Sequence, residues 1–243
     1  FFGSFALMAR VCQSLEQPAV PTFDYFSMHP ILNISVTGPD ALEFLQAQLT
    51  NDLMRLDAEG EILAAWCNPK GRVIWFGTVS KTADGYRLSA PADTAEDIVK
   101  RLTLFRFRAK VDFEIVDEGQ TVDPAFLVEQ GRPYVGRAQM ELFTPHMLNL
   151  DLLDAISMDK GCYPGQEIVA RTHYKGATKR RLQRFHCGGA AAVGDKVSDG
   201  ERDIGEVFNV AGSDLLAVVP LDKTEAPLSV SGASLKLKAL PYF

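Results

Sequence analysis

Apolar and polar positions alternate along residues 31–37 (ILNISVT), and this period of two predicts a β-strand. Residues 38–40 are Gly, Pro and Asp, a sequence that ends a strand and suits the start of a helix. Leucines then recur at spacings of three and four, which predicts a helix with one apolar face: Leu42, Leu45, Leu49 and Leu53.

The next part of the chain mixes strands and helices. Residues 62–67 and 73–80 are apolar, strand-like runs joined by the turn-forming sequence NPKG, and a third short run follows at 86–88. This order predicts an antiparallel meander. Residues 94–105 repeat apolar positions on a helical period, and 111–116 (VDFEIV) alternate again as a strand. We therefore expect the α+β class.

From Arg180 onward the pattern consists only of short strand-like runs separated by Gly, Asp and Ser at intervals of about ten residues. These runs are RLQRFHC, DKVS, IGEVFNV, LLAVVPL and ASLKLKAL. Closure into a small antiparallel barrel would remove the exposed edges of such a module. We predict a first domain over 1–178 and a barrel domain over 179–243.

The composition is that of a folded protein, with 47% hydrophobic residues and 23% charged residues in 243. A net charge of -6 argues against a surface devoted to a polyanion. No apolar run is long enough to span a membrane, and the first residues lack a basic leader with a cleavage site. We expect a cytoplasmic protein without membrane contact.

The four cysteines lie 55, 95 and 25 residues apart, without a C-x-x-C pair. This spacing argues against a zinc ribbon and against a disulfide scaffold, so no metal site is expected. Cys12 shares a helical face with apolar residues, and Cys67 ends the apolar run ILAAWC. We expect both thiols to be core residues.

Residues 159–176 (DKGCYPGQEIVARTHYKG) carry the candidate chemistry. Two glycines and a proline surround Cys162, and a helical spacing follows, so Cys162 is predicted at or just before a helix N-terminus. Such a position, with Lys160 and Arg171 nearby, favours a reactive thiolate. The alternative is a structural turn in which the thiol only packs. A Cys-His hydrolase is not indicated, because neither His146 nor His173 has the surroundings known from cysteine proteases.

The same region is strongly basic. Residues 160–184 contain seven Lys and Arg residues against Glu167 alone. This run is either a solvated linker or an anion site for polyglutamate, phosphate or RNA. Few aromatic residues interleave with it, so base stacking is not evident.

At this segment the chain resembles the YgfZ family, folate-binding and tRNA-modification-linked relatives of the glycine-cleavage T-protein (GcvT). The family hallmark has the form K-G-C-Y-x-G-Q-E-x-x-x-R-x-x-x-K/R-G, and residues 160–176 match it at every fixed position. The resemblance extends through 147–157 and 177–182. A weaker likeness covers VTGPDALEFLQAQLTNDL and AAWCNPKGRV nearer the N-terminus.

The resemblance implies a GcvT-like folate-binding body of mixed antiparallel sheets and helices around a central hole, completed by the C-terminal β-barrel. It implies tetrahydrofolate or another reduced folate as ligand, and a role in iron-sulfur cluster assembly or maintenance in client enzymes, with tRNA involved indirectly. A classical enzyme is not expected, and a monomer is slightly favoured.

The resemblance also implies roles for individual residues. Cys162 is the functional thiol, Lys160 and Arg171 support its loop, and Gln166 and Glu167 cap the turn. Trp75 on its strand offers an aromatic face to a pterin. Further folate contacts are expected from Asn68, Tyr163 and Lys175.

Two departures from longer family members affect the folate site. The middle subdomain is shorter here, which implies a more open hole, and tryptophans associated with folate in a longer relative align near Ile31 and Asp123.

The alternative function is a tetrahydrofolate-dependent aminomethyltransferase of the T-protein type. That chemistry needs a carboxylate beside the folate ring nitrogen. Because Trp75 and Phe76 stand where an acidic pair is expected after the NPKG turn, the accessory role is favoured.

Overall fold

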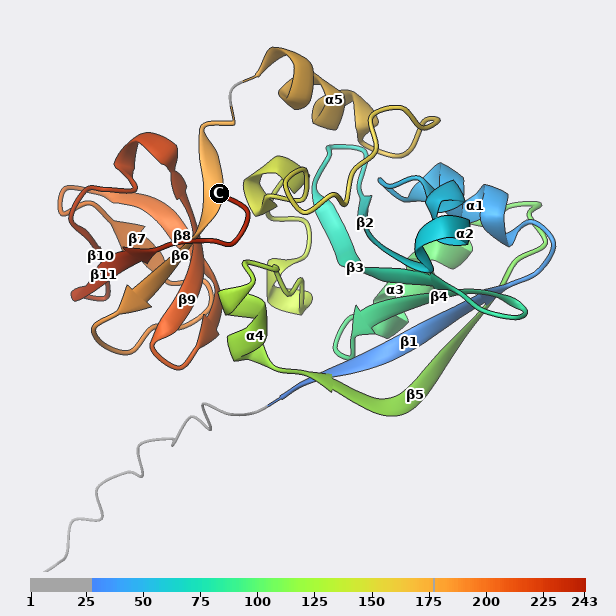
Figure 1. Ribbon diagram of the computed structural model, residues 1–243, viewed down its shortest axis with the longest axis horizontal. Helices are drawn as coiled ribbons and strands as arrows, with labels where there is room; N and C mark the ends of the chain where they lie inside the picture. The colour runs from blue at the N-terminus through green and yellow to red at the C-terminus, as the bar shows by residue number, and fades with distance from the viewer. Residues whose placement is uncertain (1–27, 177) are drawn as a thin grey trace, which may run out of the picture.

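The computed structural model describes residues 28–176 and 178–243 (Figure 1). In Figure 1 a β-barrel lies on the left, a five-stranded sheet with its helices lies on the right, and α5 (Gln166–Lys175) crosses the top. The predicted α+β class with a C-terminal antiparallel barrel is confirmed. None of the helices in the described ranges is long and apolar enough to cross a membrane. The expected helix around Cys12 lies outside the described residues.

The sheet is antiparallel throughout, in the order β2-β3-β4-β1-β5. The predicted meander forms its first three strands. Its strands are β1 (His29–Thr37), β2 (Glu61–Cys67), β3 (Val73–Lys81), β4 (Gly85–Pro91) and β5 (Asp112–Val122). Most positions of β2 and β3 are buried on both faces, which explains why their sequences read as continuous apolar runs.

Helices cover one face of this sheet. They are α1 (Ala41–Gln48), the short α2 (Leu56–Glu59) after a 3₁₀ turn at Leu53–Arg55, and α3 (Ala95–Phe105). Their buried side chains form one apolar cluster with the strands. Of the leucines on the predicted helical face, Leu45, Leu49 and Leu53 are buried. The helix ends at Gln48, before the last two of them, because the chain becomes extended at Leu49.

The opposite face packs against irregular chain and the barrel. The irregular part contains α4 (Pro124–Glu129) and 3₁₀ turns at Arg137–Gln139 and Pro145–Leu148. A second apolar cluster runs without interruption from β2 and β3 into the barrel, and it includes Val73, Phe76, Phe208, Leu216 and Val218. The division at 178/179 therefore stays a prediction, since the two parts share a core.

The barrel is closed in the order β10-β11-β6-β9-β8-β7. Its strands are β6 (Arg180–Cys187), β7 (Lys196–Ser198), β8 (Asp203–Ala211), β9 (Asp214–Pro220), β10 (Leu228–Val230) and β11 (Ala233–Lys238). Five of these were expected from the strand-like runs. β10 was missed, because three residues are too short to show a period of two.

Candidate functional site

The loop that carries Cys162 is attached to the C-terminal end of α1. Lys160 Nζ donates hydrogen bonds of 2.5 Å to the backbone oxygens of Gln46 and Leu49. A cation is favourable there, because the last carbonyl groups of a helix carry the negative end of its dipole. Burial lowers the pKa of Lys160 to about 8. Through these two bonds the Lys160 side chain attaches the loop to the end of α1, and its supporting role for Cys162 stays a prediction.

The chain leading into this loop is fixed by two buried polar residues after α1. Thr50 Oγ1 donates to the Ala155 oxygen at 2.7 Å, and Asn51 Nδ2 donates to the Asp154 oxygen at 2.8 Å. Both side chains are fully buried. Sequence analysis missed them; the only signal was two polar residues directly after an apolar helix face.

On its other side the loop rests on the 68–71 turn between β2 and β3. Gly165 has φ +79°, a conformation that favours glycine. A Cβ on Gly165 would lie 2.5 Å from the Asn68 oxygen and 2.8 Å from the Gly71 Cα. Gly71 has φ +67°, and a Cβ on Gly71 would lie 2.9 Å from the Cβ of Ile168. The two glycines allow the loop and the turn to approach closely.

Cys162 lies between these two attachments and is exposed. α5 begins at Gln166, so the thiol precedes a helix N-terminus, as the sequence predicts. Gly161 has open space around it. The loop thus presents a thiol to solvent from a backbone fixed on both sides. The reactivity of that thiol stays a prediction.

Cys162 is expected to alkylate first, at least 100-fold faster than Cys67 or Cys187, since both of these are buried. Burial raises the pKa of Cys67 to about 12, which removes its thiolate at neutral pH. Limiting iodoacetamide followed by peptide mapping measures the order, and denatured protein provides the control in which the thiols label alike. Native labelling of Cys12, Cys67 or Cys187 before Cys162 would contradict the reactive-thiol interpretation.

The side chain of Tyr163 is buried beneath the loop. Its ring lies below Lys160, with Nζ 5.4 Å from the ring centroid, a cation–π geometry. Its hydroxyl has no hydrogen-bond partner among the described residues, and burial raises its pKa. A direct folate contact by Tyr163 is therefore not supported by its position.

Of the other hallmark residues on α5, Glu167, Arg171 and Lys175 are exposed and Gln166 is half-buried. The expected capping role of Gln166 and Glu167 is wrong, because Gly165 occupies the N-cap position and no side chain caps the helix. Arg171 and Lys175 are exposed and form no ion pair within the described chain. They contribute positive potential but do not hold the Cys162 loop, contrary to the expectation for Arg171.

Two residues that were expected to contact folate make other interactions within the protein. Trp75 is 1% exposed in the core beneath the helices, and its Nε1 donates to the Ser89 oxygen at 2.9 Å, so it offers no open face. Asn68 builds the 68–71 turn: its Oδ1 accepts from the backbone nitrogens of Lys70 and Arg72, and its Nδ2 donates to Glu141. Neither side chain is free to bind a ligand.

The basic run does not converge on one anion site. Arg181 makes a two-pronged ion pair with Asp151, at 2.9 and 2.8 Å, and Arg184 pairs with Asp214. Arg180 donates to a backbone oxygen in β8. With Lys160 bound to α1, four of the seven basic side chains serve the structure.

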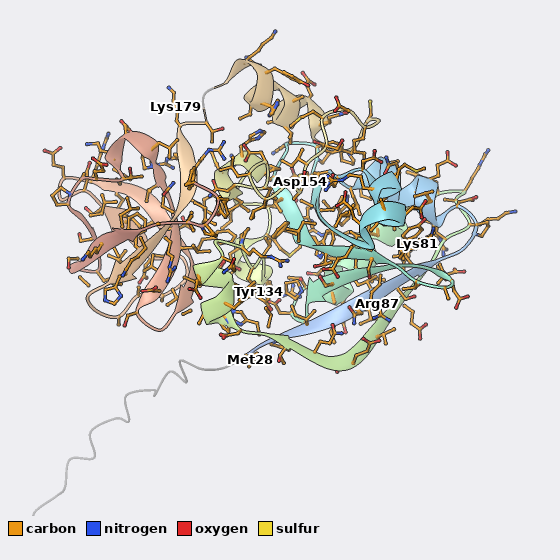
Figure 2. All side chains as sticks on the ribbon, in the orientation of Figure 1. Met28, Lys81, Arg87, Tyr134, Asp154 and Lys179 are labelled. Carbon is orange, nitrogen blue, oxygen red and sulfur yellow. The ribbon has the colours of Figure 1, made fainter. Side chains whose placement is uncertain are left out.

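A separate cavity of about 220 Å³ lies between the sheet and the chain after α4. Its wall includes residues of β3 and β4 together with Arg132 and Tyr134; in Figure 2, Tyr134 lies well below Asp154 in the view. The Arg132 Nε is buried without a partner among the described residues. The lining is Ile31, Phe76, Gly77, Thr78, Ser89, Pro91, Val122, Leu127, Arg132, Pro133 and Tyr134. None of the four expected folate contacts lines this cavity. Ile31, near which a folate-associated tryptophan of a longer relative aligns, does line it.

The arrangement of sheet, helices and barrel is the fold of the T-proteins. The chain is similar to the glycine cleavage system aminomethyltransferase T from Bartonella henselae, with a TM-score of 0.62, 13% identity, and coverage of 90% of this chain and 88% of that one. Residues 179–241 match the C-terminal beta-barrel domain of CAF17.

Sequence comparison shows which proteins this chain is similar to within the fold class. The chain is 26% identical to the tRNA-modifying protein YgfZ of Serratia proteamaculans, over 79% of each chain. It is 23% identical to the iron-sulfur cluster assembly factor IBA57 homolog, mitochondrial, of Pyricularia oryzae, over 61% of this chain and 54% of that protein. The resemblance to the YgfZ family, predicted from the Cys162 hallmark, is confirmed.

Proposed function

We propose that this protein is a folate-binding accessory protein that supports iron-sulfur cluster assembly or maintenance in client enzymes, including tRNA-modifying ones, through the Cys162 thiol. The observation that carries the proposal is the exposed thiol on a loop fixed at both ends, by Lys160 on α1 and by Gly165 on the 68–71 turn. The similarity to a tRNA-modifying protein and to an iron-sulfur assembly factor supports it.

The chemistry of the site fits this role. A thiolate is a nucleophile and a soft ligand for iron. One exposed cysteine is an incomplete ligand set for a cluster, and no group of three or more His, Cys, Asp or Glu in the described ranges is arranged to hold a metal. The thiol therefore acts together with groups of a second protein, which its exposure permits.

The function is tested by complementation of a bacterial strain that lacks its own YgfZ. Expression of this chain is expected to restore an iron-sulfur-dependent tRNA modification, measured by mass spectrometry of tRNA nucleosides. If the chain is expressed in soluble form at a full level but the tRNA modification is not restored, the proposal is contradicted.

The cavity behind β3 and β4 is the proposed folate site. Typical small-molecule pockets measure about 300–1,000 Å³, so this cavity accommodates one ring system and leaves the rest of a folate outside. Arg132 supplies a cation, and burial raises the pKa of Tyr134 to about 12, which keeps its hydroxyl a donor. The lining contains no carboxylate, which favours binding over aminomethyl transfer.

Arg132→Met is expected to weaken tetrahydrofolate binding about tenfold or more, because a charge-assisted hydrogen bond is worth about 1.5–3 kcal/mol. Calorimetry measures the affinity. Tryptophan fluorescence gives a second readout, since a Cβ on the cavity residue Gly77 would lie 2.8 Å from Trp75. Arg87→Met, on an exposed ion pair outside the cavity, is the matched control. Equal affinities of both variants and the wild type would place the folate elsewhere.

A further inference from the structure

The end of α3 and the connection that follows it, residues 104–110 (LFRFRAK, the 104–110 loop), present large apolar side chains to solvent. Phe107 is 88% exposed and Leu104 is 70% exposed. Phe107 also has φ +42°, an unfavourable conformation for a bulky residue. Neither burial nor backbone preference explains the outward position of this ring. Strained residues of this kind cluster at binding sites.

The charge around the 104–110 loop is strongly positive. Residues 100–110 contain five basic residues and no acidic one, in a chain of net charge -6. Arg101 and Arg106 pair with Glu141 and Asp112. In the described part of the chain, Lys100, Arg108 and Lys110 form no ion pair, and all three are exposed. In the sequence, the exposed Phe107 is thus flanked by exposed basic residues that form no ion pair in the described part of the chain.

The 104–110 loop and the Cys162 loop sit at opposite ends of α1. At the start of α1, the Asp40 carboxylate accepts the Lys110 backbone N–H at 2.7 Å; at its end, Leu49 accepts from Lys160. Eight helical residues span about 12 Å. Figure 1 shows α1 and the connection from α3 to β5 at the right-hand end of the body, away from the barrel. A standard protein interface covers about 800 Å² on each partner, which is enough to include both loops.

We propose that the 104–110 loop is a docking surface for a client protein, whose acidic, apolar pocket receives Phe107. The proposal rests on the proposed function for the client's role: docking here would place the client's cluster site beside Cys162. Aromatic and arginine residues are enriched at protein interfaces, where a few well-packed side chains carry most of the binding free energy.

A protein fits this surface better than RNA. Binding to a single strand uses several aromatic platforms and a continuous basic groove. Here the basic segment ends at β5, where Glu114 and Asp117 are exposed and form no ion pair in the described part of the chain. These carboxylates repel a phosphate backbone, whereas a protein pocket contacts only the tip of the loop.

The test places a photoreactive benzoylphenylalanine at position 107 of the full chain, expressed in the YgfZ-deficient strain. The matched control carries it at Phe126, a 48% exposed phenylalanine on α4, beside the barrel. A discrete, protease-sensitive adduct from position 107 is expected. An RNase-sensitive adduct, or one no stronger than from position 126, overturns the proposal.

The captured protein is then purified, and its affinity is measured for the wild type, Phe107→Ser and Arg108→Glu. Each variant is expected to bind at least tenfold more weakly at an unchanged melting temperature, with added salt weakening the wild-type complex. Unchanged affinities overturn the proposal.

A further experiment separates a failure of the docking surface from a failure of the proposed function. Cys162→Ala in the photoreactive chain is expected to keep the adduct. If the wild-type chain fails to complement but the adduct and the tenfold losses are found, the proposed function is wrong and the docking surface stands. If Phe107→Ser complements as well as the wild type, the docking surface is wrong.

Discussion

Gly165→Val is expected to destabilise the protein strongly and to abolish its function. A β-branched residue at φ +79° costs about 1–3 kcal/mol, and its Cβ would meet the backbone of Asn68 and Gly71 below 3 Å, where nothing flexible can move away. A total of roughly 3 kcal/mol or more corresponds to a fall in melting temperature of about 6–12 °C for a chain of this size. Thermal melts and the complementation assay measure the two effects.

The control is Gly200→Val. Gly200 also has a positive φ, +93°, but a Cβ there has nothing within 4 Å. Its loss of stability is expected to be clearly smaller, and its complementation is expected to be normal. If the two variants have the same melting temperature, backbone strain alone explains the loss of stability. The close approach of the Cys162 loop to the 68–71 turn would then not be the reason for a glycine at position 165.

Cys162→Ala is expected to abolish complementation and to leave the free energy of unfolding within about 0.5 kcal/mol of the wild type. The thiol is exposed, so its removal creates no cavity, unlike the truncation of a core side chain. Folate affinity is expected to stay unchanged, since Cys162 is not among the residues that line the cavity. Denaturant unfolding and tRNA analysis give the two readouts.

Cys67→Ala is the matched control, because Cys67 is buried in the cluster shared with the barrel. It is expected to lose stability and to keep activity in the folded fraction. Full complementation by Cys162→Ala would leave the thiol without a role. A melting temperature many degrees lower for Cys162→Ala would instead identify a packing residue.

Local patterns in the sequence predicted the elements of the fold well. The meander, α3 and the barrel follow from periods of two and 3.6 and from turn residues that act over a few positions. The position of Cys162 before a helix could be predicted for the same reason, since Pro164 and Gly165 mark the start of α5.

The contacts that hold the site could not be predicted in this way. Lys160 reaches an oxygen 114 residues away in the sequence, and Gly165 rests on a turn nearly 100 positions earlier, which no local period encodes. The error for Trp75 has a different cause. β3 is buried on both faces, so alternation does not tell which residues point to a cavity.

The apolar cluster shared by the sheet and the barrel makes the two parts mechanically inseparable. Val73 and Phe76 of β3 belong to the same buried apolar cluster as Phe208 and Val218 of the barrel, and Phe143 lies edge-on to Phe208 with ring centroids 5.5 Å apart. Any swing of the barrel would expose this surface to water at about 25 cal/mol per Å². The barrel therefore serves as a fixed wall of the body.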